Sequence, residues 1–141
     1  MDEARIVFEP FVDEAVRQFI VGGVDNFNIA ATGISNWSPA NFVLRADGGE
    51  VVGGLLAFAW GGWLQISHLW VAESRRAQGW GARLLAAAEA FARDHGCVGA
   101  ALDTFSFQAR PFYERHGYVV VGEMADFPPG HSRYFLQKRL D

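Results

Sequence analysis

Residues 71–85 read VAESRRAQGWGARLL and connect two predicted elements of secondary structure. It joins an apolar run that is typical of a β-strand to an amphipathic run that is typical of an α-helix. Gly79 and Gly81 stand where the helix begins, and Arg75 and Arg76 precede them. A helix N-terminus offers unpaired N–H groups and the positive end of the helix dipole. The stretch is therefore a candidate cradle for a phosphate or pyrophosphate, with a plain glycine-rich turn as the alternative.

Two other phosphate-binding motifs do not fit this stretch. No Gly-Lys-Ser/Thr follows the glycines, which excludes a P-loop. The third glycine and the first-strand position of the dinucleotide-binding fingerprint are also missing. Arg83 adds a further positive charge one turn into the helix.

The segments that follow predict a strand–helix–strand unit. Apolar residues recur on one helical face between Ala82 and His95, and Gly96 is placed to end this helix. Residues 98–104 form an apolar run that is typical of a buried strand. Because a helix separates this strand from residues 63–72, we expect the two strands to be parallel, with a right-handed crossover.

The rest of the chain adds antiparallel strands and two more helical regions. Asp47-Gly48 between two apolar runs predicts a hairpin, and Gly22-Gly23 predicts a break in the helical pattern of residues 12–32. The expected order is β-α-α-β-β-β-α-β-α-β-β. This is a single α/β domain, residues 1–141, with a mixed twisted sheet of about seven strands and about four helices. The remaining strands are expected at residues 4–9, 42–46, 51–60, 118–124 and 132–140, with a short helix at 108–116 and loops at 33–40 and 125–131.

Composition excludes several classes of protein. The chain has 141 residues, 50% of them hydrophobic, which fits one folded domain and excludes wholesale disorder. A net charge of −4 does not provide the excess of basic residues that is typical of a nucleic-acid-binding protein. The longest apolar stretch, residues 51–64, is too short to span a membrane. The histidines and Cys97 lack metal-ligand spacing, and one cysteine favours a reducing compartment, hence a cytoplasmic protein.

Two motifs resemble those of a known family. Residues 76–81, RAQGWG, match the Gln/Arg-x-x-Gly-x-Gly/Ala signature of the GNAT superfamily of acyl-CoA N-acyltransferases, and Leu69-Trp70-Val71 resembles the strand that precedes it. Residues 109–118, ARPFYERHGY, resemble the second signature of the family. The resemblance covers nearly the full chain, including the element order. It implies a GNAT-like fold and acetyl-CoA as co-substrate, without a metal.

The resemblance also implies where the co-substrate binds. Acetyl-CoA would lie in a V-shaped opening between the strands at 63–72 and 98–104, with its pyrophosphate on the N–H groups of residues 78–82. The backbones of Leu69 and Val71 would bond the pantetheine amides. Ser106 stands where many relatives carry Asn, with a shorter reach. The implied cofactor-binding residues are Leu69, Trp70, Val71, Arg76, Ala77, Gln78, Gly79, Trp80, Gly81, Ala82 and Ser106.

The implied reaction is direct transfer of an acyl group from a thioester to a neutral amine. Tyr113 occupies the position of the family's general acid, which protonates the leaving thiolate; the alternative for this tyrosine is simple packing beside Phe112. The N–H of Val71 is the candidate donor to the carbonyl oxygen. Pro111 fits only a first helical turn, so we expect the helix to start near Gln108 or Ala109.

The general base is not fixed by the sequence. His68 is a base by chemistry, but strand alternation places it on the opposite face from Ser67 unless a bulge re-aims it. Asp103, at the end of the next strand, could hold an ammonium group or accept a proton through water. A water chain that ends on Gln65 or Ser67 is the third option.

The acceptor is inferred from charge. Residues 1–60 carry 3 basic and 8 acidic side chains, a net charge of −5, which favours a small cationic or amino-acid-like primary amine, with a peptide or protein lysine as second choice. A sensor that binds acetyl-CoA without turnover is the alternative function. A homodimer through an exposed aromatic such as Trp37 or Trp60 fits either function. The candidate acceptor-binding residues are Asn28, Trp37, Gln65, Ser67 and Phe127.

Overall fold

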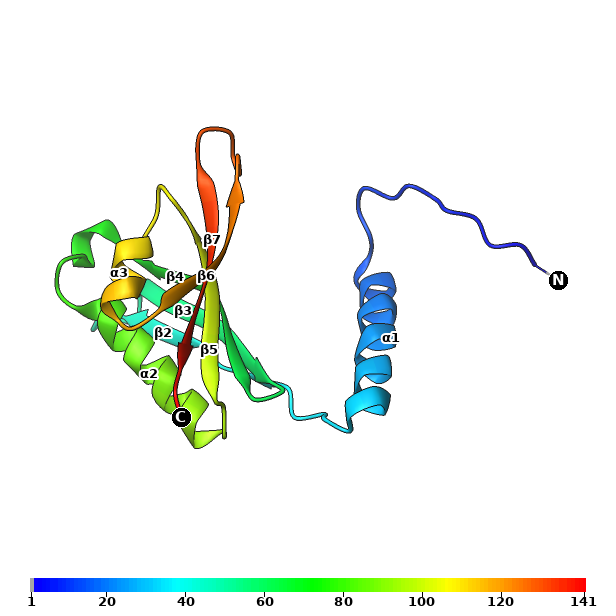
Figure 1. Cartoon of the computed structure of the whole chain (residues 1–141), viewed down its shortest axis with the longest axis horizontal. Helices are drawn as coiled ribbons and strands as arrows, with labels where there is room; N and C mark the ends of the chain where they lie inside the picture. Colours follow the sequence, from blue (N-terminus) through cyan, green and yellow to red (C-terminus); the bar gives the residue numbers. More distant parts are fainter. Residues whose placement is uncertain (1) are drawn as a thin grey trace. The chain divides into compact units, whose positions relative to one another are not determined.

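A computed structural model describes residues 2–141 (Figure 1). The chain divides into two compact units, residues 1–35 and residues 36–141. The first unit contains one helix, and the second contains the sheet and all the other helices. None of the helices in the described part of the chain is long and apolar enough to cross a membrane.

The first unit contains helix α1 (Glu14–Thr32), which runs unbroken through Gly22-Gly23. The Asp13 side chain accepts a hydrogen bond from the Val16 N–H at 2.9 Å, and Gly33 ends the helix at φ 72°. The predicted break is therefore wrong, because glycine lowers helix stability by only about 1 kcal/mol and both ends of α1 are capped. The predicted strand at residues 4–9 is also wrong, since this segment pairs with no strand.

The second unit is built on a mixed sheet of seven strands, as predicted, with the order β1-β3-β4-β5-β7-β6 and β2 beside β3. The pair β4–β5 is parallel and all the other described pairs are antiparallel. A two-residue strand, β1, replaces part of the loop expected at 33–40. The strands are β1 (Ser38–Pro39), β2 (Phe42–Arg45), β3 (Val51–Trp60), β4 (Trp63–Val71), β5 (Gly99–Phe105), β6 (Val119–Ala125) and β7 (Ser132–Arg139).

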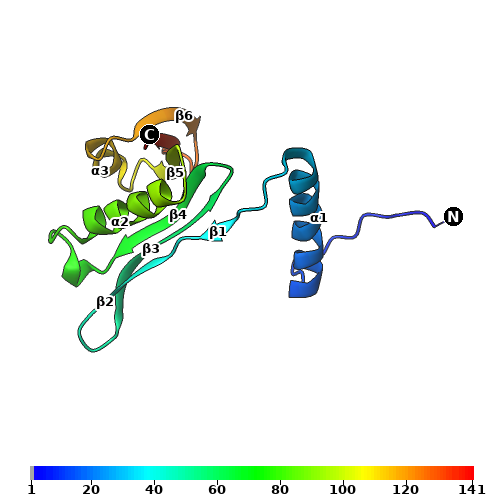
Figure 2. The ribbon, with the colours of Figure 1, turned by 90° about the horizontal axis from the view of Figure 1, so that it is seen from below.

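The helices of the second unit follow the prediction closely. A 3-10 turn, η1 (Glu73–Arg75), leads into α2 (Trp80–Asp94), and α3 (Arg110–Arg115) follows β5. Helix α2 lies along one face of the sheet, against β2 to β5 (Figure 2). Three α-helices are present among the described residues instead of about four, because α1 is not divided.

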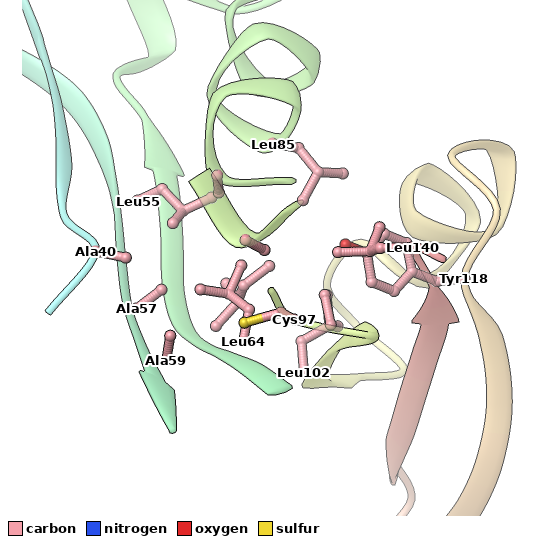
Figure 3. Packing of buried hydrophobic residues seen from close by; sticks show 14 of the residues in the cluster. Ala40, Leu55, Ala57, Ala59, Leu64, Leu85, Cys97, Leu102, Tyr118 and Leu140 are labelled. Carbon is pink, nitrogen blue, oxygen red and sulfur yellow. The ribbon is translucent and has the colours of Figure 1, made fainter. Parts of the chain in front are cut away.

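The core lies between α2 and the sheet (Figure 3). The buried face of α2 is the one that the helical spacing predicted, and Leu85 and Ala88 on it are fully enclosed. They pack against residues that alternate along the central strands, such as Leu55 and Leu64. Burial raises the pKa of the Cys97 thiol, so this side chain acts as a small core residue.

A buried polar network joins three segments of the second unit. The Tyr118 hydroxyl donates to Glu89 Oε2 at 2.9 Å, and Lys138 Nζ donates to Glu89 Oε1 at 2.8 Å. Burial, followed by the neighbouring Glu89 carboxylate, raises the pKa of Tyr118. Because both carboxylate oxygens have donors, the buried charge of Glu89 is satisfied and fixes α2 against β7.

Candidate active site

The site is an opening where two parallel strands separate. Strands β4 and β5 pair only between residues 63–65 and 99–101, and beyond this point no ladder joins them. A cavity of about 990 Å³ lies there. It is lined by the end of β4, the loop that leads to α2, the end of β5, and α3. The separation of β4 and β5 agrees with the opening that the family resemblance implied.

The edge of β4 presents backbone groups to this opening. The Ala72 N–H bonds the Val52 carbonyl of β3 at 2.8 Å, so Trp70, two residues earlier, also points its backbone toward β3. Leu69 and Val71 therefore direct their N–H and C=O groups to the opposite side, where β5 has diverged. The Val71 carbonyl accepts a hydrogen bond from Arg76 Nε at 2.9 Å.

A β-bulge at Ser67 explains why the strands separate. Leu56 pairs with His68 and Ala57 pairs with Ile66, which leaves Ser67 as an extra residue on β4. A bulge bends its strand, and this one lies two residues after Gln65, the last residue of β4 that pairs with β5. It also places Ser67 and His68 on the exposed face together, and both line the cavity. Strict alternation, which put them on opposite faces, fails here because of the extra residue.

The loop before α2 has the backbone of an anion site. Gly79 caps α2 at φ 83°, and no side chain occupies its cap, so the first N–H groups of the helix lack capping partners. Ala77 is also left-handed, at φ 59°, a conformation that costs a non-glycine residue about 1 kcal/mol. Arg75 and Arg76 line the cavity beside this loop. These groups fit a pyrophosphate.

The start of α2 lies close to α3 at Gly81. A Cβ at this position would lie 3.4 Å from the Phe112 ring, which is an ordinary contact distance. Farther along the helix, the Arg83 guanidinium lies 4.3 Å from the centre of the Trp80 ring. Trp80 Nε1 donates to Gln78 Oε1 at 3.3 Å, which links two of the predicted cofactor-binding residues.

Tyr113 lines the cavity from α3 and is 7% exposed. Its ring is held edge-on by Phe112, with centroids 5.2 Å apart, and by Tyr118, at 5.9 Å. Burial, with a smaller contribution from the Asp103 carboxylate, raises the pKa of Tyr113 to about 12. The phenol therefore keeps its proton at neutral pH.

The two candidate bases both line the cavity, His68 from β4 and Asp103 from β5, but their surroundings differ. Asp103 Oδ2 accepts from Arg133 Nε at 2.8 Å, so this carboxylate is ion-paired. His68 Nδ1 lies 3.1 Å from the Ser67 hydroxyl, and its ring is exposed. The pairing with Arg133 favours Asp103 as a fixed negative charge. The exposed imidazole of His68 is the freer of the two to accept a proton.

Other predicted site residues lie outside the cavity lining. Ser106 is engaged by the β6–β7 connection, because its hydroxyl accepts from the Ser132 N–H at 3.0 Å and lies 3.2 Å from His131 Nδ1. Trp37 stacks on Phe58 beside β1. Gln65 is exposed at the last β4–β5 pair. Asn28 belongs to the first unit, on α1.

The structure adds residues that the sequence did not indicate. Arg133 is the ion-pair partner of Asp103, and Phe107 and Phe112 line the cavity. Arg133 lies 30 positions from Asp103 along the chain, and only the β5–β7 pairing brings the two together. An apolar residue in a predicted loop, as Phe107 is, was the one available signal.

Comparison with known proteins identifies the family. Residues 8–118 match the family model described as the acetyltransferase (GNAT) family. The acetyltransferase Atu2258 of Agrobacterium fabrum is 37% identical over 91% of this chain and 90% of its own length. The blasticidin-S acetyltransferase of Streptomyces morookaense is 43% identical over 65% of this chain and 68% of its length. The crystal structure of an acetyltransferase from Bacillus cereus superposes with a TM-score of 0.81 at 32% identity, over 94% of this chain and 97% of that one. The chain therefore belongs to the GNAT family and is an acetyl-CoA-dependent N-acetyltransferase.

Proposed function

We propose that the enzyme transfers the acetyl group of acetyl-CoA directly to the primary amine of a small cationic or amino-acid-like acceptor. One observation carries this proposal: Asp103 is the one acidic side chain among the described residues that line the cavity, which it shares with Tyr113. A carboxylate attracts an ammonium group and orients it. The name of the relative that acetylates blasticidin S supports an acceptor of small size. A peptide or protein lysine is the second choice within this class.

Acetyl-CoA is expected to bind along the edge of β4 and across the start of α2. The outward backbone groups of Leu69 and Val71 would bond the pantetheine amides as an added half-strand. The pyrophosphate would accept from the N–H groups of residues 78–82. The proposed cofactor contacts remain Leu69, Trp70, Val71, Arg76, Ala77, Gln78, Gly79, Trp80, Gly81, Ala82 and Ser106.

The reaction then needs three groups of this chain. The neutral amine nitrogen attacks the thioester carbonyl carbon, so that the N–C bond forms and the C–S bond breaks. The Val71 N–H would donate to the oxygen that gains charge. Tyr113 gives its proton to the departing thiolate. The extra proton on the nitrogen passes to His68, to Asp103, or to water held near Ser67.

The experiment is a thiol-release assay with acetyl-CoA against cationic amines, amino acids and lysine peptides. We expect acetylation of small amines, verified by mass spectrometry of the product, and slower turnover of peptides. Equal or faster turnover of lysine peptides would reverse the proposed order of acceptors. If every amine stays unmodified while acetyl-CoA binds in calorimetry, the proposed function is wrong. The proposed acceptor contacts are Asn28, Trp37, Gln65, Ser67 and Phe127.

A homodimer and a cytoplasmic location complete the proposal. The proposed contact between two copies of the chain is an exposed aromatic side chain such as Trp37, which is 58% exposed, because aromatic residues are enriched at protein–protein interfaces. Sedimentation velocity should show twice the monomer mass, and Trp37→Asp should restore the monomer. The single free Cys97 fits a reducing compartment.

A further inference from the structure

An exposed group of aromatic side chains lies beside the cavity, at the end of β5 and in the β6–β7 connection. We refer to Phe105, Phe107, Phe127 and His131 as the aromatic wall. The rings of Phe105 and Phe107 are nearly parallel, with centroids 5.4 Å apart and planes at 12°. Phe127 lies 5.4 Å from Phe105, and His131 meets Phe107 edge-on at 5.0 Å.

The aromatic wall is linked by a hydrogen bond and is open to solvent. The Ser106 hydroxyl lies 3.2 Å from His131 Nδ1, which ties the two loops together. Phe107 is nevertheless 55% exposed and Phe127 is 39% exposed. An aromatic ring buries a large area where it packs in a core. Phe107, in contrast, lines the cavity that also holds Asp103 and Tyr113.

Charge at the wall is balanced. The Arg133 guanidinium lies 5.8 Å from the centre of the Phe105 ring and 5.4 Å from that of Phe127, within cation–π range. The same guanidinium pairs with Asp103, so a positive and a negative group adjoin the exposed rings. An apolar ring surface with a carboxylate beside it complements a molecule that has a flat ring and an ammonium group.

We infer that the preferred acceptor carries a flat, unsaturated ring a short distance from its amine, and that this ring stacks on Phe107 while Asp103 holds the ammonium group. The inference rests on the proposed function, because the acceptor is the molecule that the enzyme acetylates. It narrows the class from small amines in general to amines with a planar ring.

The test compares two amines that differ only in the ring. Both 2-phenylethylamine and 2-cyclohexylethylamine have the same carbon skeleton, but only the first has a flat ring. We expect the wild-type enzyme to favour 2-phenylethylamine about 5-fold or more in kcat/KM. Phe107→Leu should remove this preference by raising KM for the flat amine, with KM for acetyl-CoA unchanged. Phe8→Leu, which alters an exposed ring of the first unit, is the matched control and should keep the preference.

Two kinetic outcomes would overturn the inference. One is equal turnover of the two amines by the wild-type enzyme. The other is a fall in kcat/KM in Phe107→Leu that is equally large for both amines. Saturation-transfer NMR with CoA present separates binding from chemistry. If no amine is acetylated but the phenyl protons receive saturation in wild type and not in Phe107→Leu, the proposed function fails and the ring site stands. If they receive none, the ring site is wrong.

Discussion

At the scale of single residues, Tyr113 illustrates how burial sets a chemical role. Its ring is enclosed by Phe112 and Tyr118, and its pKa rises to about 12 because the charged phenolate would be poorly solvated. A phenol with this pKa is still protonated near pH 10, where a primary amine begins to lose its proton. The proposed proton donor and a neutral acceptor amine can thus coexist at one pH.

The first prediction concerns this phenol. Tyr113→Phe keeps the ring and removes the proton donor, so kcat should fall about 100-fold while KM for acetyl-CoA changes little. In the wild-type enzyme, kcat/KM should rise with pH as the acceptor amine loses its proton, without a falling limb up to about pH 10. Steady-state kinetics between pH 6 and about pH 10 check both points. A falling limb near pH 8 that Tyr113→Phe abolishes would contradict the assignment.

The same pKa has a consequence for stability. The folded-state pKa of Tyr113, about 12, exceeds the value of about 10 in an unfolded chain. Its contribution to the free energy of unfolding is therefore complete below about pH 10 and is lost as pH rises through about 12. Stability measured by urea unfolding should decline over this range less steeply in Tyr113→Phe than in wild type.

At the scale of secondary-structure elements, the loop before α2 depends on Gly79. Gly79→Glu would force a left-handed glutamate onto a helix N-terminus that we propose holds a pyrophosphate. We expect KM for acetyl-CoA to rise at least ~10-fold, through strain and charge repulsion. Gly49→Glu is the matched control, because Gly49 has φ 92°, has equally open surroundings, and lies outside the cavity lining. If both variants change KM alike, Gly79 has no special role.

In helix α1, Gly→Ala substitutions are expected to stabilise the helix at two positions and to destabilise it at a third. A Cβ at Gly22 or Gly23 would meet nothing within 4 Å, so Gly22→Ala and Gly23→Ala should each stabilise α1 by about 1 kcal/mol. Gly33 caps the same helix at φ 72°, and Gly33→Ala should destabilise it by a similar amount. Hydrogen-exchange protection of the α1 amides measures both effects. Equal effects at the three positions would show that α1 does not persist in solution as one capped helix.

At the scale of the whole molecule, much of the second unit could be predicted from sequence. Regular alternation gave the strands, helical spacing gave the buried face of α2, and the crossover rule gave the parallel pair that opens into the cavity. The first unit was predicted less well, because nothing local distinguishes a tolerated Gly22-Gly23 pair from a break. The same is true of residues 4–9, whose strand pattern finds no partner. Contacts between distant segments, such as Arg133 with Asp103, depend on strand register and left no trace in the sequence.

Close packing across the sheet gives a prediction for global stability. A Cβ at Gly99 would lie 2.5 Å from the Trp63 ring and 2.9 Å from the Lys138 carbonyl oxygen. Gly99→Ala should therefore lower the free energy of unfolding by about 1–3 kcal/mol, measured by denaturant titration. The loss should be smaller in a Trp63→Leu background, because one of the two clashes is then relieved. If the loss of stability is as large in the Trp63→Leu background, the clash with the Lys138 carbonyl oxygen, and not the one with the Trp63 ring, causes it.

The bulge at Ser67 implies that one residue can be deleted from the middle of a central strand without unfolding the protein. Leu64 and Ile66 precede it and Leu69 and Val71 follow it, and all four face the core, although the spacing across Ser67 is odd. Ser67 is thus the one residue of β4 that has no paired position on β3. A chain from which it is deleted would keep its partners on β3 and its inward side chains, yet β4 would run straight. Such an enzyme should melt near the wild-type temperature and lose most of its turnover. The result would show that the fold does not need Ser67, whereas the opening of the site does.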